Sequence, residues 1–152
     1  MPDAKEAALK FLKNKDRTEQ EIVRFLKKNG WDQVGIEDTL EYLKALHYVD
    51  DYQYAVNFLE MSMDRNRGPL RIARELSAKG IVSHIIEDAM YEVMPQEWER
   101  NAALRISDDI QSKNPSLSNE KLLAKIVNKL SYEGFNEEVI NDMAEEFDSS
   151  AT

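Results

Sequence analysis

The fold is decided by the stretch Ile22-Val23-Arg24-Phe25-Leu26-Lys27-Lys28-Asn29-Gly30, because its pattern returns twice along the chain. The second copy runs from Ile72 to Gly80, and the third runs from Ile126 to Gly134. Each copy begins with two apolar residues, has a leucine four positions after the first of them, and ends in glycine. That spacing is typical of one face of a helix. Repetition with a period near 50 residues indicates a tandem helical array.

Each repeat predicts three helices, since apolar residues recur every three or four positions and never alternate with period two. Thr18 and Glu21 form a capping-box pattern, and Asp50 and Ser118 are suited to capping the helices that follow them. The glycine that closes each copy is expected to end its helix in the left-handed conformation. The expected helices are about 4–14, 18–29 and 34–47, then 51–65, 69–80 and 82–94, then 96–113, 118–133 and 136–147.

These helices predict an all-α protein made of three tandem three-helix repeats, which form an elongated, curved array. The repeats are assigned to residues 1–50, 51–95 and 96–147, followed by a flexible tail over 148–152. Three units of this size bury their apolar faces against one another, and the surface of such an array commonly binds an extended partner. We interpret four large aromatic residues as core: Trp31, Tyr48, Tyr54 and Trp98.

The composition excludes several classes of protein. The 152 residues include no cysteine, so a disulfide framework, a thiolate zinc site and a cysteine nucleophile are excluded. No apolar run is long enough to span a membrane, and the first residues show no secretory signal, which predicts a cytoplasmic protein. His47 and His84, the only histidines, lie in different repeats, and no glycine-rich phosphate loop is present. We therefore expect no enzyme activity, no cofactor and no metal.

The net charge of −9 hides a basic segment. Residues 65–79 carry five basic side chains and one acidic side chain, Glu75, whereas residues 96–152 carry a net charge of −6. Arg67, Arg71 and Arg74 share a helix face wherever the helix is continuous, and arginine suits contact with carboxylate or phosphate. A solvated face with Arg71–Glu75 and Glu75–Lys79 pairs explains the spacing equally well. The candidate partner-binding residues are Arg65, Arg67, Arg71, Arg74 and Lys79.

Two motifs resemble those of the RecX family of regulatory proteins. The first is Tyr48-Val49-Asp50-Asp51 with Tyr54-Ala55, and the second is Arg67-Gly68-Pro69 with Arg71-Ile72, Glu75-Leu76 and Lys79-Gly80-Ile81. The first repeat agrees through Arg17-Thr18-Glu19 and Glu21, and the likeness covers residues 7–147. The resemblance implies tandem three-helix repeats, as the periodicity does.

The resemblance further implies a negative modulator of the recombinase RecA. Such a protein binds in the groove of the RecA filament on single-stranded DNA and inhibits recombination, ATP hydrolysis and co-protease activity, which places it in DNA repair and the SOS response. The five basic residues are then the candidates for contact with the filament, and we expect the protein to be a monomer. The excess of acidic side chains predicts only weak or indirect contact with nucleic acid. The alternatives are a DNA-binding module of helix-turn-helix type and a generic helical scaffold for another protein.

Overall fold

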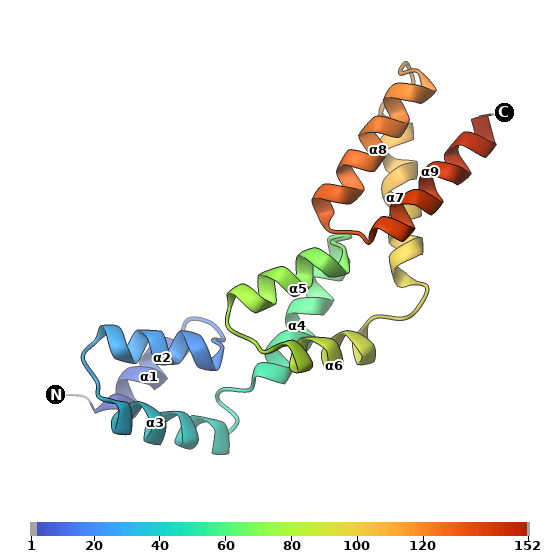
Figure 1. The fold of residues 1–152 in the computed structure, drawn as a ribbon. Helices are drawn as coiled ribbons and strands as arrows, with labels where there is room; N and C mark the ends of the chain where they lie inside the picture. The colour runs from blue at the N-terminus through green and yellow to red at the C-terminus, as the bar shows by residue number, and fades with distance from the viewer. Residues whose placement is uncertain (1–2, 152) are drawn as a thin grey trace. The chain divides into compact units, whose positions relative to one another are not determined.

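The computed structural model describes residues 3–151, and that part of the chain consists of nine α-helices and no strand (Figure 1). The expected all-α class and the helical-repeat array are confirmed. The first three helices are α1 (Ala4–Leu12), α2 (Glu19–Lys28) and α3 (Gln33–Ala45). The next three are α4 (Asp51–Asp64), α5 (Pro69–Ala78) and α6 (Ser83–Val93). The last three are α7 (Trp98–Lys113), α8 (Asn119–Glu133) and α9 (Glu137–Ala151).

The chain forms two compact units, and the helices of the middle repeat contribute to both. The first unit consists of the residues up to Phe58 together with Glu75–Ala89. The second unit consists of Leu59–Arg74 together with the residues from Met90 onward. The basic segment at 65–79 is therefore divided, with its four arginines in the second unit and Lys79 in the first.

The first unit has an apolar core built by α1, α2 and α3. Ile22 and Leu26 project from α2 and are fully buried, as the helical spacing of the repeat predicts. They pack in one cluster with Ile36 and Leu43 of α3 and with small residues of α1. Burying apolar side chains of this size supplies most of the stability of such a unit.

The second unit has an equivalent core built by α7, α8 and α9, which lie beside one another (Figure 1). Ile126 and Leu130 of α8 occupy the same repeat positions as Ile22 and Leu26, and both are buried. Phe135 follows Gly134 into this core, where its ring stacks on Trp98 with centroids 6.4 Å apart. The repeated sequence pattern therefore marks the inward side of each middle helix.

The expected helix caps are present. Thr18 and Glu21 form the complete capping box at the start of α2. The Asp50 carboxylate accepts a hydrogen bond from the Gln53 backbone N–H at 3.0 Å, and the Ser118 hydroxyl accepts one from Lys121. The three repeat glycines have φ angles of 89°, 91° and 87°, which confirms the left-handed conformation at all of them. Each cap involves residues close in sequence, so a local pattern is enough to predict it.

Two joints connect middle helices of successive repeats, one in each unit. In the first unit the Thr18 hydroxyl donates to the carbonyl oxygen of Lys79 at 2.7 Å, and the Glu19 N–H donates to the Asp51 carboxylate at 2.9 Å. In the second unit the Gly68 N–H donates to the Glu133 carbonyl oxygen at 2.7 Å. In each joint the beginning of one middle helix meets the end of the middle helix one repeat later, and in the first joint it also meets Asp51 at the start of α4. Hydrogen-bonding groups left unpaired at helix ends thereby find partners.

The Asp51 carboxyl is the perturbed acid of the first joint. Burial raises the pKa of Asp51 above its ordinary value, although the hydrogen bond from the Glu19 N–H acts in the opposite direction. The Lys44 ammonium lies 2.7 Å from the Glu19 carboxylate, and their hydrogen bond raises the pKa of Lys44. The joint therefore contains a charge-sensitive group that the sequence pattern does not reveal.

The structure corrects two expectations. Tyr48 is not a core residue, because it is 55% exposed, whereas Trp31, Tyr54 and Trp98 are partly buried. The last helix does not end near residue 147 but continues to Ala151, because no glycine or proline interrupts it after Phe147. Thr152, the end of the expected tail, lies outside the described residues.

Candidate partner-binding surface

The basic segment begins at a tight bend between α4 and α5. The buried Ser62 supplies its backbone carbonyl to the N–H groups of both Arg65 and Arg67, at 3.1 Å each. Asn66 lies between them with φ at 56°, a left-handed conformation that asparagine tolerates better than most residues. Gly68 and Pro69 then start α5. The bend holds Arg65 and Arg67 close to the start of the helix that carries Arg71 and Arg74.

Arg71 has a structural partner in the next repeat, which the sequence pattern does not predict. Its guanidinium Nη1 lies 3.0 Å from a carboxylate oxygen of Glu133, at the end of α8. The exposed fractions of the two side chains are only 19% and 10%. The guanidinium also lies over the Tyr132 ring, 5.4 Å from its centroid, and that ring is 69% exposed. Arg71 therefore links α5 to α8 through an ion pair with Glu133.

Arg65 and Arg74 are the exposed members of the set. No hydrogen bond or ion pair engages either side chain within residues 3–151. Arg67 has an intermediate level of exposure. An exposed guanidinium without an internal partner keeps all of its donors for an external carboxylate or phosphate. Arg65 and Arg74 are accordingly the residues of this set best suited to contact a partner.

Lys79 belongs to the first unit and lies just after α5. Its ammonium group lies 5.9 Å and 5.8 Å from the ring centroids of Tyr54 and Phe58, within the range of cation–π attraction. Its carbonyl oxygen accepts the Thr18 hydrogen bond of the first joint. The side chain and the backbone of Lys79 therefore both make contacts within the first unit.

Sequence reasoning missed three residues of α8 that surround Arg71. Glu133 accepts Arg71 and also Lys129, whose ammonium lies 3.1 Å away, and Lys129 and Arg71 both lie near the Tyr132 ring. The one available signal is the position before each repeat glycine, which is Asn29, Lys79 and then Glu133. The change of charge at this position marks Glu133, but it does not identify the partner 62 residues earlier.

The described residues contain no group of three or more His, Asp or Glu side chains that could hold a metal ion. Within the same residues, no helix has both the length and the apolar character needed to cross a membrane.

Comparison with known proteins identifies the family. Residues 4–43 match the family model for the first three-helix domain of RecX, and residues 50–90 match the model for the second three-helix domain. The regulatory protein RecX of Vibrio campbellii is 30% identical over 132 residues, which cover 87% of this chain and 83% of that protein. The chain belongs to the RecX family. The RecX domain boundaries at 50–90 include the bend, α5 and all five candidate residues.

Solved structures of RecX proteins agree with the fold. The crystal structure of RecX from Lactobacillus salivarius superimposes with a TM-score of 0.85 at 25% identity, over 95% of this chain and 94% of that one. A second crystal structure of a regulatory protein RecX has a TM-score of 0.76 and covers 91% of this chain and 70% of that one.

The length of the RecX relatives varies. The regulatory protein RecX of Lactobacillus johnsonii is 29% identical over 98% of this chain, but the match covers only 55% of that protein. The chain thus spans about half the length of several curated relatives that it matches.

Proposed function

We propose that the protein is a cytoplasmic negative modulator of RecA. In this proposal it binds in the groove of the RecA filament on single-stranded DNA and inhibits recombination, ATP hydrolysis and co-protease activity, without chemistry of its own. The observation that carries the proposal is the match to two consecutive RecX domains, the second of which contains the arginine-rich bend. The exposed, unpaired side chains of Arg65 and Arg74 support contact with a charged partner.

The net charge of the chain favours protein carboxylates over DNA phosphates as the main partner groups. At −9 the chain as a whole is repelled by a polyanion, so its contact with nucleic acid is expected to be weak or indirect. A guanidinium binds a carboxylate through two parallel hydrogen bonds, which lets a few arginines give specificity despite the overall charge.

The test is RecA-dependent ATP hydrolysis on single-stranded DNA, measured with increasing amounts of the protein. The parent is expected to inhibit, and Arg74→Glu should require an about tenfold higher concentration for the same inhibition, because it reverses one exposed charge-assisted contact. Arg24→Glu is the matched control, since Arg24 is an exposed arginine on α2, outside the candidate set.

Two outcomes contradict the proposal. One is an unchanged rate of ATP hydrolysis at saturating protein. The other is tight, strongly salt-dependent binding of the protein to DNA without RecA, which would favour the DNA-binding module instead.

A further inference from the structure

An open cleft in the second unit gathers cationic side chains that the proposed partner-binding residues do not fully account for. The cleft has a volume of about 460 Å³ and lies among the bend at 65–66, α7 and α8. Each of these elements contributes one basic residue: Arg65, Arg105 and Lys129. The cleft therefore collects three basic side chains although the chain as a whole has a net charge of −9.

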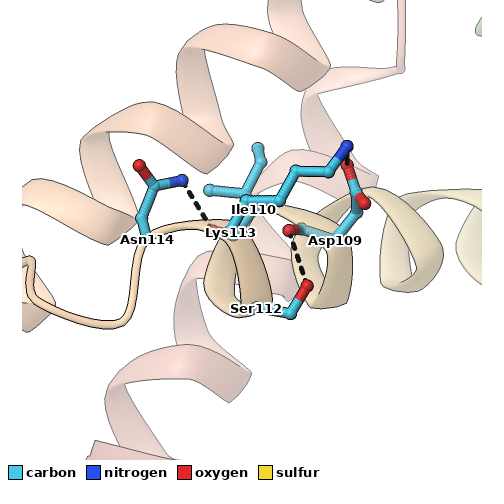
Figure 2. Close-up of polar contacts among 5 residues, drawn as sticks. All are labelled: Asp109, Ile110, Ser112, Lys113 and Asn114. Atoms are coloured by element: carbon cyan, nitrogen blue, oxygen red, sulfur yellow. Dashed lines mark hydrogen bonds and ion pairs between the residues drawn. The ribbon is translucent and has the colours of Figure 1, made fainter.

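The carboxylates in the cleft are already neutralised. Asp109 forms an ion pair with Lys113 of the same helix, with Nζ and Oδ2 3.1 Å apart (Figure 2). Glu133 forms ion pairs with both Arg71 and Lys129. Neither acid therefore balances the guanidinium groups of Arg65 and Arg105, which have no carboxylate within ion-pair distance among residues 3–151.

Arg105 is held in place without being neutralised. Its Nε and Nη2 both donate to the Asn66 Oδ1 oxygen, at 3.2 Å and 3.0 Å. Asn66 is itself fixed by its left-handed backbone and by a hydrogen bond from its N–H to the Met63 carbonyl at 2.9 Å. Because a neutral amide oxygen is the acceptor, the positive charge remains, and the other guanidinium donors stay available.

We propose that this cleft is an oxyanion site that binds one phosphate group of a small phosphorylated ligand. A phosphate offers three or four oxygens, enough to accept from Arg65, from Arg105 and from a remaining N–H donor of Lys129, which also pairs with Glu133, whereas a carboxylate offers two. Glu60 and Asp64 line a second cleft that shares Arg105 and Asn66 with the first. These acids and the overall negative charge disfavour a long polyanion, so a single phosphate on a small ligand fits the surroundings best.

The test uses the full chain labelled with ¹⁵N at low ionic strength, titrated with inorganic phosphate and, separately, with a short oligothymidylate. We expect saturable shifts of the Arg105 Nε–H signal and of the Asn66 backbone signal with inorganic phosphate. Arg105→Gln should weaken that binding about tenfold, because it removes a charge-assisted bidentate donor. Arg105→Lys keeps the positive charge but loses the forked guanidinium, so its affinity for phosphate should lie between those of the parent and Arg105→Gln.

Arg74→Gln is the matched control, because Arg74 is exposed, lies in the same unit and does not line the cleft. Absence of saturable shifts, or equal weakening by Arg105→Gln and Arg74→Gln, overturns the site. Tighter binding of the oligothymidylate than of phosphate overturns the assignment to a small ligand and places a phosphodiester in the cleft. The experiment contains no RecA, so its result is independent of the proposed function.

Discussion

At the scale of single residues, the most consequential contact is the one between Arg71 and Glu133. The pair is largely screened from water, and Glu133 receives a second cation in Lys129. Removing one member of a buried ion pair costs far more than removing an exposed one, because the remaining charge keeps its desolvation penalty without its partner. Arg71, a charged residue of α5 and a candidate for partner binding, therefore stabilises the contact between two repeats.

Arg71→Glu should lower the free energy of unfolding by about 2–4 kcal/mol, since it places a carboxylate against Glu133. Arg74→Glu should change it by less than about 0.5 kcal/mol, because Arg74 is exposed and unpaired. The double variant Arg71→Glu/Glu133→Gln should recover part of the loss, and chemical denaturation measures all three. Equal stability of the two single variants would contradict the structural role of Arg71, and it is for this reason that Arg74 alone is the probe of function.

Asp51 gives a prediction for pH dependence. Its raised pKa means that the folded state holds the proton more tightly than the unfolded state, whose ordinary value is 3.8. Its ionisation therefore lowers stability as the pH rises through the folded pKa. Asp51→Asn keeps an oxygen that can accept the Glu19 N–H but removes the charge. As the pH rises above 3.8 and through the raised folded pKa of Asp51, the melting temperature of the parent should fall relative to that of the variant. A difference independent of pH would contradict this account.

At the scale of elements, the repeat glycines have different surroundings despite their shared backbone conformation. A Cβ atom at Gly30 would meet nothing within 4 Å. At Gly134 it would collide with the backbone and Cβ of Arg71, and at Gly80 with the Gln20 side chain. The left-handed conformation is required at all three positions, but the close approach of two helices is required only at the joints.

Gly30→Ala and Gly134→Ala separate these two requirements. Gly30→Ala should cost about 1–2 kcal/mol of stability, the cost of a side chain at positive φ. Gly134→Ala should cost roughly 1–3 kcal/mol more, because α5 must also move away from α8. Thermal and denaturant unfolding of both variants measure the difference. Equal losses of stability in the two variants would show that α5 and α8 can move apart without an energetic cost.

At the scale of the whole molecule, the distribution of charge distinguishes the classes of partner. Binding through RecA carboxylates predicts that affinity for the filament falls only gradually with added salt, because few condensed counterions are released. It also predicts little affinity for naked single-stranded DNA at physiological ionic strength, given the net charge of −9. Fluorescence anisotropy with labelled DNA, with and without RecA, measures both. A steep salt dependence of filament binding would indicate phosphate contacts instead.

The all-α class, the helical repeats, the capping box at Thr18 and the left-handed glycines can all be predicted from the amino-acid sequence. These features depend on contacts within a few residues and on a helical spacing that repeats, so the local pattern contains them. The resemblance to the RecX family is also visible in the sequence, because the residues of the motif at 67–81 lie at fixed spacing.

Which charged side chains remain unpaired depends on how the helices pack. The partner of Arg71 lies 62 residues away in Glu133, and Arg105 reaches Asn66 across 39 residues. Helical periodicity orients a side chain on its own helix, but the neighbouring helix determines whether it is paired, and folding brings that helix near. For the same reason the sequence pattern predicts Tyr48 in the core, although the residue is exposed, and does not reveal that Asp51 is buried in a joint. Burial and pairing are properties of contacts distant in sequence, and the packing of the helices alone sets them.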